Sequence, residues 1–369
     1  MNSTIFNGLH KNGYHVDIIF LSYSDICDNF QQRYSSYFNN VHYIKIKKTK
    51  INFFKNEKLK VLNSFLVHFI KDRLWRPYKK ADLKELAVSD YDLILSFCPP
   101  AISGLLARDV IKINKLENIP HYQYWTDPLS LGLCNEVKDM PKKRYFHYIL
   151  EKNILKDADK IIYCYPLLCE MQKQLYPQFA HKMKWADVPY IERNVSTFEK
   201  KKGKTQVKIG FFGAYPRRVR NILPLLNAMQ SFPDVLFIVR GDTDVSIDKT
   251  QYQNLDIEFG RKPNDEIQQL EDECDILLSS GSIAGINHPA GKTFYYANVN
   301  KPIVYIGDGY HKDYFANYLK EFDRYIICDN NEDSIKSAIN QAIKSLSTFR
   351  LSMSERLHPE VVARKIVSF

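Results

Sequence analysis

The sequence predicts an α/β fold with two domains, each built on a parallel sheet covered by helices. The chain of 369 residues is longer than the roughly 100–200 residues of a typical domain. Short apolar runs alternate with stretches of helical character, and parallel strands need such helices as crossover connections. A polar stretch at 196–206 interrupts the alternation, which then restarts. We expect domains at 1–195 and 196–357, with a closing helix at 358–369.

In the first half, Ser3 is expected to cap a short helix, which ends in a left-handed turn at Gly13. A basic, mostly helical region reaches about residue 87. The expected strands are 16–21, 41–46, 91–97, 120–125 and 160–164, and further helices are expected at 101–115, 142–158 and 167–175. Pro99-Pro100 stops the third strand, because proline cannot donate to a ladder. An Asp-Pro turn at Asp127 ends the fourth strand.

The second half repeats the same alternation. The expected strands are 208–212, 235–240, 255–259, 276–279, 302–306 and 325–328, with a helix at about 221–231 and further helices between the later strands. In an open parallel sheet, ligands bind beyond the carboxyl ends of the strands. We therefore look for functional residues in the turns that follow these strands.

The net charge of +10 lies almost wholly in residues 1–195. Most of the excess is in Lys45–Lys84, where aromatic and aliphatic residues are interleaved with the basic ones. Such a basic amphipathic stretch can lie on an anionic membrane surface. It can equally be a solvated helical face with a packed underside. Both interpretations stay open, and no motif for reading nucleic acid accompanies the basic segment.

Several classes of protein are disfavoured by the composition. No run of about 20 apolar residues is present, so no membrane-spanning helix is expected. The first residues lack the basic-then-apolar pattern of a signal peptide. The seven cysteines are odd in number and form no Cys-x-x-Cys pair, so we expect neither disulfides nor a zinc site. A cytoplasmic protein with free thiols and no bound metal fits these observations.

The first stretch that suggests chemistry begins at Gly213. An apolar strand runs into this glycine, and Arg218 and Arg220 follow before the next helix. Free backbone N–H groups at a helix N-terminus attract phosphate, and arginine adds paired donors that suit phosphate oxygens. A tight turn with exposed arginines is the alternative.

The second stretch is a loop followed by a short helix and a strand. Gly285, Ile286, Asn287 and His288 form the loop, and Lys292 stands in the first turn of the helix. On its own, such a lysine is more often a surface residue than a phosphate ligand. A loop histidine likewise more often faces solvent than a sugar.

Together these stretches resemble the C-terminal half of GT-B glycosyltransferases, in particular their large family four. The matching pieces are Gly213, Arg218 or Arg220, Gly260-Arg261, Pro289 through Lys292 to Tyr296, and Lys301-Pro302-Ile303-Val304. Further pieces match the N-terminal half: the strand 91–96 with Pro99-Pro100, then Ile119-Pro120, Asp127-Pro128 and Glu151 followed by Ala158-Asp159. The order and spacing carry the resemblance, which spans about residues 5–369. It implies two Rossmann-like domains facing across a cleft.

The resemblance also implies an activity. It implies transfer of a sugar from a nucleotide-diphosphate sugar, with retention of anomeric configuration and no tightly bound cofactor or metal. The implied catalytic residues are Asp127, Arg218 and Lys292, and the implied donor-binding residues are Gly213, Arg220, Arg240, Gly260, Arg261, Gly285, Ile286, Asn287, His288 and Tyr295. The expected acceptor is a cell-envelope glycan or a lipid-linked acceptor. The expected location is cytoplasmic, with peripheral contact to the inner face of the membrane through Lys45–Lys84.

The sequence departs from the family pattern in three places. Two positions that are often glutamate in the family are Asn287 and Tyr295 here. Thr126 replaces a usual histidine or arginine before Asp127. The family's first strand and its Gly-rich loop have no counterpart. These departures favour a second hypothesis, a non-catalytic GT-B partner subunit or glycan-binding protein, and an epimerase on the same fold is a third.

The absent strand carries an expectation about the N-terminal sheet. The first strand of a doubly wound domain normally lies at the sheet centre. We therefore expect the strand 16–21 to be followed in space by the strand 91–97, with the absent strand between them. Either the sequence is part of a longer protein, or its N-terminal sheet has an unusual strand order.

Overall fold

The computed structural model describes residues 2–22, 35–45, 78–84, 86, 91–131, 134–140, 144–192, 206–283 and 289–369. The chain forms two compact units. Unit 1 consists of Val188–His358 together with Leu133–Asn135, and unit 2 consists of Asn2–Gly132, Glu136–Asp187 and Pro359–Phe369. The chain therefore passes from unit 2 to unit 1 and returns for its last helix.

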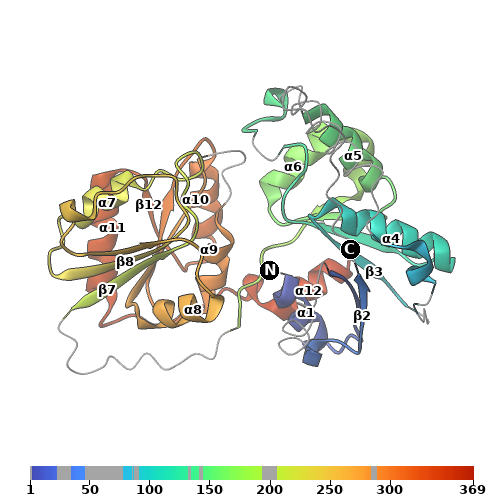
Figure 1. Cartoon of the computed structure of the whole chain (residues 1–369), viewed down its shortest axis with the longest axis horizontal. Helices are drawn as coiled ribbons and strands as arrows, with labels where there is room; N and C mark the ends of the chain where they lie inside the picture. Colours follow the sequence, from blue (N-terminus) through green and yellow to red (C-terminus); the bar gives the residue numbers. More distant parts are fainter. Residues whose placement is uncertain are drawn as a thin grey trace, which may run out of the picture. The chain divides into compact units, whose positions relative to one another are not determined.

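Unit 1 contains a six-stranded parallel sheet with the order β12-β11-β10-β7-β8-β9 (Figure 1). The strands are β7 Val207–Phe212, β8 Val235–Gly241, β9 Leu255–Phe259, β10 Ile276–Ser280, β11 Ile303–Gly307 and β12 Ile326–Asp329. The helices are α7 Leu223–Met229, α8 Asn264–Glu273, α9 Gly291–Tyr295, α10 Lys312–Lys320 and α11 Glu332–Ser345, with short 3₁₀ turns at Lys249–Gln251, Tyr296–Asn298 and Glu355–Leu357. All six strands expected from the sequence are present, with ends shifted by at most one residue.

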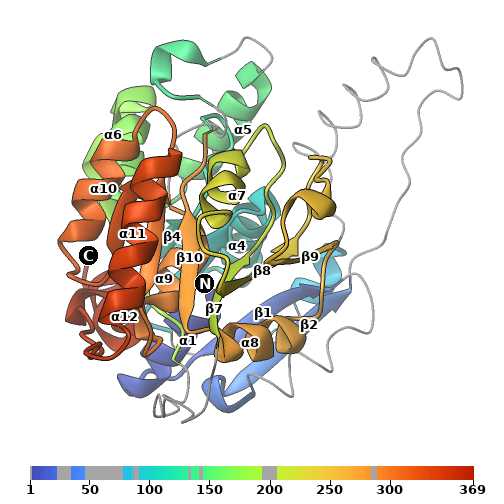
Figure 2. The same cartoon turned by 90° about the vertical axis from the view of Figure 1, so that its left-hand side faces the viewer.

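Two apolar layers sandwich this sheet, because successive strand residues point to opposite faces. Phe211 belongs to the layer formed with α7 and α11, which cover the face seen in Figure 2. Phe212 belongs to the opposite layer, with Leu277 and Tyr296. The strand order reverses between β7 and β10, the place where ligands bind in open α/β sheets.

Glycine is required where β7 and β8 end. Gly213 and Gly241 have φ of +142° and +155°. The Gly213 N–H donates to the Arg240 carbonyl at 2.9 Å. A Cβ added to Gly241 would lie 1.9 Å from the Gly213 carbonyl oxygen. The close approach of the two strand ends therefore excludes a side chain at Gly241, while Gly213 has open space and is favoured by its φ.

Unit 2 contains parallel strands in two separate ladders. β1 Asp17–Ser22 pairs with β2 Asn40–Lys45, and β3 Ile94–Cys98, β4 His121–Trp125, β5 Lys160–Tyr163 and β6 Met183–Trp185 form a four-stranded sheet in that order. The helices are α1 Asn2–Lys11, α4 Ala101–Asn114, α5 Tyr145–Leu155, α6 Pro166–Leu175 and α12 Pro359–Val367, with 3₁₀ turns at Ser35–Tyr37, Lys80–Leu83, Val137–Asp139 and Pro177–Lys182. The sequence reading missed β6, which is short and carries an exposed lysine, Lys184.

The two ladders of unit 2 share one helical layer. Leu106 and Val110 of α4 pack with Ile44 of β2, and Ile19 and Leu21 of β1 border the same cluster. No backbone ladder joins β1 to β3 within the described residues.

One hydrogen bond nevertheless links the segments of these two strands. The Tyr91 hydroxyl donates to Asp17 Oδ2 at 2.5 Å. The segments 16–21 and 91–97 are therefore close in space. That the family's first strand is absent between them stays a prediction.

Helices α1 and α12 pack together at a glycine. A Cβ added to Gly8 would lie 2.1 Å from the Pro359 carbonyl oxygen. Asn12 donates through Nδ2 to the Glu360 carbonyl at 2.9 Å and accepts from Arg364 at 3.1 Å. The two helices, from opposite ends of the chain, lie side by side (Figure 1).

Helix α1 ends where the sequence predicts, but it begins earlier than predicted. Gly13 ends α1 with φ of +81°, as predicted. The helix already includes Asn2, so Ser3 lies within its first turn instead of capping it.

Most of Lys45–Lys84 lies outside the described residues. In the described part, Tyr78 is buried and its hydroxyl donates to Asp109 Oδ2 at 2.9 Å. The membrane-surface prediction therefore stays a prediction.

Candidate functional site

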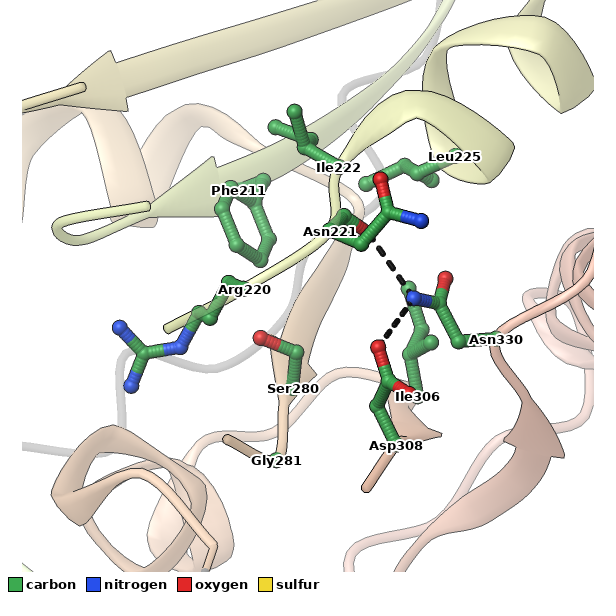
Figure 3. Close-up of a pocket in the computed structure, with 10 residues that line it drawn as sticks. All are labelled: Phe211, Arg220, Asn221, Ile222, Leu225, Ser280, Gly281, Ile306, Asp308 and Asn330. Carbon is green, nitrogen blue, oxygen red and sulfur yellow. Dashed lines mark hydrogen bonds between the residues drawn. The ribbon is translucent and has the colours of Figure 1, made fainter. Parts of the chain in front are cut away.

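A pocket in unit 1 opens at the carboxyl ends of β7, β10 and β11 (Figure 3). It lies beside the reversal in strand order, as expected for a ligand site in this type of sheet. Apolar side chains from the sheet and α7 form one part of the lining, and polar residues from four strand ends form the rest. The lining residues are Phe211, Arg220, Asn221, Ile222, Leu225, Ser280, Gly281, Ile306, Asp308 and Asn330.

Arg220 places a positive charge in this pocket. Its side chain is half-buried, and its guanidinium donates to the Ala214 carbonyl, within the turn that follows Gly213. Burial lowers the pKa of Arg220, and the nearby Tyr305 raises it. An arginine stays charged even with a lowered pKa, so the pocket favours an anionic ligand group.

Two buried hydroxyl groups beside Arg220 lack hydrogen-bond partners among the described residues. They are Ser280 Oγ and Tyr305 Oη. A Cβ added to Gly281, which lines the pocket next to Ser280, would lie 2.8 Å from Tyr305 Oη. Burial raises the pKa of Tyr305, so its hydroxyl keeps its proton and can donate. Buried hydroxyl groups are nearly always paired, so these two favour a bound oxygen from water or from a ligand.

A hydrogen-bonded chain crosses the far side of the pocket. Asn330, directly after β12, donates through Nδ2 to Asp308 Oδ2 at 2.5 Å and to the Asn221 carbonyl at 2.9 Å (Figure 3). Asp308 Oδ1 accepts from the Gly309 N–H at 2.8 Å. This chain connects the ends of β11 and β12 to the residue next to Arg220, and so fixes the Arg220 loop.

Other predicted catalytic and donor-binding residues lie around the Gly213 turn without lining this pocket. Arg218 is exposed in the turn. Gly260 has φ of +99° and donates to the Gly241 carbonyl at 3.3 Å, and Arg261 beside it is exposed.

Arg240 is placed differently. Its guanidinium is buried and donates to Asp256 Oδ2 at 2.8 Å, which ties β8 to β9. Its side chain therefore links β8 to the edge strand β9, and its backbone carbonyl accepts from the Gly213 N–H.

The turn is also supported by Asp242-Thr243-Asp244. Asp244 Oδ1 accepts from the Arg217 N–H at 2.6 Å, and the Thr243 hydroxyl donates to the Tyr215 carbonyl at 3.0 Å. The Asp242 and Asp244 carboxylates count against the predicted metal independence. Carboxylates of this kind can hold a divalent cation together with substrate phosphates.

Lys292 lies against the opposite layer of the sheet from Phe211. Its ammonium group forms an ion pair with Glu271 at 2.5 Å and lies over the rings of Phe212 and Tyr296. The Tyr296 hydroxyl donates to the same Glu271 oxygen at 2.8 Å. No contact between Lys292 and Arg218 or Arg220 is seen in the described part of the chain. Its predicted role at the diphosphate competes with this ion pair and stays a prediction.

The remaining donor-loop residues fall largely outside the described part. Gly285, Ile286, Asn287 and His288 lie there, so their predicted roles stay predictions. Tyr295, at the end of α9, is half-buried.

In unit 2, Asp127 is exposed and is the second residue after β4. Its carboxylate accepts from the Thr126 hydroxyl at 3.1 Å. The loop that continues from it is anchored by Glu151, a fully buried carboxylate that accepts from the N–H groups of Leu129 and Ser130 at 3.1 and 3.0 Å.

Two hydroxyl groups complete the environment of Glu151. They belong to Ser130 and to Tyr176, the latter at 2.9 Å. Burial raises the pKa of Glu151, although these hydrogen bonds lower it. The Glu151 side chain thus fixes the loop after Asp127 through hydrogen bonds to the backbone of Leu129 and Ser130.

The described residues contain no group of three or more His, Cys, Asp or Glu side chains that could hold a metal ion. The six cysteines among them are free and buried, and burial raises the pKa of Cys98 to about 12. No helix in the described part is both long and apolar enough to cross a membrane.

Comparison with known proteins identifies the fold. No protein-family model and no curated protein matches the sequence. Among solved structures, HepE from Anabaena, in complex with UDP and glucose, shares 14% identity with a TM-score of 0.53 over 99% of this chain and 91% of that chain. The glycotransferase of kitacinnamycin shares 12% identity with a TM-score of 0.52 over 100% and 94%. A glycosyltransferase from Rickettsia africae shares 14% identity with a TM-score of 0.50 over 100% and 89%.

The chain therefore has the α/β fold of the GT-B glycosyltransferases, with two Rossmann-like domains. This confirms the fold class predicted from the sequence. The resemblance to family four in particular, and the expected cleft between the domains, stay predictions.

Four pocket residues were missed by the sequence reading. They are Ser280, Asp308 and Asn330 of the lining, together with Tyr305, whose buried hydroxyl lies behind Gly281. Three of them end or directly follow an apolar strand, and a polar residue at that position is a signal that the carboxyl-end rule could have used.

Proposed function

We propose that this protein is a glycosyltransferase that uses a nucleotide-diphosphate sugar. The observation that carries the proposal is the half-buried Arg220 beside two unpaired buried hydroxyl groups, at the ligand-binding edge of a GT-B sheet. The HepE structure with the same fold holds UDP and glucose. A diphosphate would find a positive charge and the Ser280 hydroxyl in one pocket, with the Tyr305 hydroxyl behind Gly281.

In the proposed reaction, the bond between the anomeric carbon and a diphosphate oxygen breaks. The acceptor hydroxyl oxygen bonds to that carbon and loses its proton, and the nucleoside diphosphate leaves. The leaving group gains negative charge, which Arg220 and backbone N–H groups of the Gly213 turn would stabilise. We assign Arg218 and Lys292 to the same phosphate environment and Asp127 to the acceptor, as proposals.

A binding experiment tests the donor class. Thermal unfolding is followed with UDP, GDP, ADP and CDP, because a ligand that binds only the native state raises the melting temperature. At least one nucleotide should raise it. No shift with any of the four, at millimolar concentration, would contradict the proposal.

Turnover is tested separately. Release of nucleoside diphosphate from the matching nucleotide sugar is followed with EDTA and then with added Mg²⁺ or Mn²⁺. Turnover unchanged by EDTA supports the proposed metal independence. A requirement for the cation would assign a role to Asp242 and Asp244.

The acceptor is proposed to be a cell-envelope glycan or a lipid-linked saccharide, and the product to retain anomeric configuration. Support comes from the sequence resemblance and the basic segment Lys45–Lys84. Co-sedimentation with anionic and neutral liposomes tests membrane contact, which should be stronger for anionic lipid and weaker in salt. Equal binding to both would contradict it. The proton NMR spectrum of the product tests retention.

A non-catalytic partner subunit is a second candidate, favoured by the Lys292–Glu271 ion pair. Glu271 has a side chain that is 2% exposed, so it already neutralises the lysine. The variant Lys292→Ala separates the two candidates. A tenfold loss of turnover at unchanged fold supports a catalytic role. A loss of stability with unchanged nucleotide binding supports a structural one.

A further inference from the structure

A column of three tyrosine rings reaches the surface of unit 2 at the start of α5. Tyr176, directly after α6, is fully buried, Tyr148 is half-buried, and Tyr145 is 56% exposed. The Tyr148 ring stacks on Tyr176 with 5.0 Å between centroids and 12° between planes. The Tyr145 ring stacks on Tyr148 with 6.2 Å and 17°. The exposed ring therefore continues a stack that begins in the core.

The inner end of this column is anchored by hydrogen bonds. The Tyr176 hydroxyl lies 2.9 Å from a Glu151 carboxylate oxygen and 2.8 Å from the Ser130 hydroxyl. Tyr148 thus packs on a fixed ring, and Tyr145 packs on Tyr148. A ring that is oriented before binding loses little conformational freedom when a ligand arrives.

The exposed end of the column adjoins the loop that follows Asp127. Arg144, directly before Tyr145, donates through Nη1 to the Leu129 carbonyl at 3.1 Å. Leu129 is two residues after Asp127, so their Cα atoms are at most about 7 Å apart. Asp127 is itself exposed. The outer ring and this carboxylate therefore belong to adjoining segments of unit 2.

We propose that Tyr145 is an acceptor-binding residue that stacks on one face of a pyranose ring of the acceptor. The proposal rests on the proposed function, because it takes a saccharide as the acceptor. The C–H groups on one face of a pyranose are apolar and weakly positive, and the face of an aromatic ring carries the negative part of its quadrupole. The hydroxyl groups at the edge of the sugar can bond to polar neighbours such as Arg144 and Asp127.

Tyr14 provides a matched comparison in the same unit. Its side chain is 44% exposed, and no stacked ring supports it among the described residues. Single exposed aromatic residues are normal on protein surfaces and indicate no ligand. Tyr145 differs from Tyr14 in the column beneath it and in its position beside the Asp127 loop.

Saturation-transfer difference NMR on the full chain tests the proposal, because it detects ligand protons that contact the protein. The probes are the methyl pyranosides of glucose, galactose, N-acetylglucosamine and rhamnose, with 4-nitrophenol as a ring that is not a sugar. The proteins are wild type, Tyr145→Ala, Tyr145→Phe and the control Tyr14→Ala. Circular dichroism and the melting temperature verify that each variant folds. Should Tyr145→Ala fail to fold, Tyr145→Leu takes its place under the same criteria.

We expect at least one pyranoside to receive saturation on the C–H protons of one ring face. Tyr145→Ala should raise its Kd about three- to tenfold, which is the range of a single ring contact. Tyr145→Phe keeps the ring and should bind as wild type does, and so should Tyr14→Ala. Release of nucleoside diphosphate from the nucleotide sugar then gives the KM of this pyranoside as acceptor. That KM should rise by the same factor in Tyr145→Ala, while the Kd of the nucleotide stays unchanged.

The proposal is overturned if wild type binds none of the pyranosides, or if Tyr145→Ala binds them as wild type does. An equal loss in Tyr145→Phe or in Tyr14→Ala also overturns it, since stacking on this one ring is then not the cause. Binding at Tyr145 of 4-nitrophenol alone would replace the saccharide by an aromatic acceptor. A pyranoside that binds at Tyr145 and leaves the release of nucleoside diphosphate unchanged is not an acceptor, which overturns the assignment.

Failure of the proposed function gives a different result. Wild-type protein that binds none of UDP, GDP, ADP and CDP would contradict the use of a nucleotide sugar. The pyranoside titrations need no nucleotide, so they still decide whether Tyr145 stacks on a sugar ring.

Discussion

The two units treat polar groups at their strand ends in opposite ways. After β4 in unit 2, every donor that surrounds Glu151 is used by the chain itself, and the carboxylate is fully buried. At the end of β10 and within β11 in unit 1, Ser280 Oγ and Tyr305 Oη are buried and unpaired. A satisfied cluster stabilises a fold, whereas an unsatisfied one is costly unless something binds it. This contrast between the two strand ends supports the ligand site proposed in unit 1.

The largest loss of stability is expected on substitution of Glu151, whose cluster is fully hydrogen-bonded. Glu151→Ala leaves two N–H groups and two hydroxyl groups without their acceptor. We expect unit 2 to lose at least about 3 kcal/mol, since each buried group left unpaired costs about 1–3 kcal/mol. Urea unfolding followed by tryptophan fluorescence measures it, because Trp125 and Trp185 lie in the described part of unit 2. Glu170→Ala, an exposed control on α6, should change little.

The next effect concerns the seam between α1 and α12. Gly8→Ala should destabilise unit 2 by about 1–3 kcal/mol, the usual range for overpacking. Alanine favours helices over glycine by about 0.5–1 kcal/mol, so a net loss means that the clash with the Pro359 carbonyl dominates. The same fluorescence measurement applies, with His10→Ala on the exposed face of α1 as the control. A more stable Gly8→Ala protein would show that the helices can separate freely.

In unit 1, Arg220→Ala is expected to weaken binding of the preferred nucleoside diphosphate at least tenfold, or about 1.4 kcal/mol. Removal of the charge leaves the phosphate without its main partner in a partly dry pocket. Arg220→Lys should recover part of the affinity, and Arg350→Ala, an exposed arginine of the same unit, should have none of this effect. Unit 2 fluorescence unfolding should not change. Equal affinities in the Arg220→Ala protein and wild type would show that Arg220 does not bind the phosphate groups.

The smallest effect depends on pH and belongs to unit 2. His121 is buried, with Nε2 2.9 Å from Ser96 Oγ, and burial lowers its pKa. The unfolded chain therefore binds a proton at a pH where the folded chain does not. Stability contributed here is present above the unfolded pKa of about 6.5 and is lost as pH falls below it. His121→Gln should flatten the pH dependence of unit 2 unfolding between pH 7 and 5, and an unchanged slope would contradict this assignment.

The fold was predictable because strand periodicity and strand ends are local properties. β9, Leu255–Phe259, was placed with its observed ends, and β7 and β8 were placed to within one residue. The turn at Gly213 was also predictable, because only a residue without a side chain allows the observed φ.

The site was less predictable because its residues meet only in the folded sheet. Ser280, Asp308 and Asn330 come from three strands that are adjacent in space and distant in sequence. The ion pair between Lys292 and Glu271 joins α9 to α8, and nothing in the local sequence indicates that partner. Arg240 was among the donor-binding residues implied by the resemblance, but its side chain forms an ion pair with Asp256.

The seam between α1 and α12 also sets an order of events during synthesis. Unit 2 takes its last helix from Pro359–Val367, after the whole of Val188–His358 has been made. Domains generally fold as they emerge, the N-terminal one first. Here the apolar side of α1, with Ile5 and Leu9, is covered only after α12 leaves the ribosome at the end of translation. The unit that is started first is therefore completed last, and a chain stopped at residue 358 exposes that side of α1 permanently.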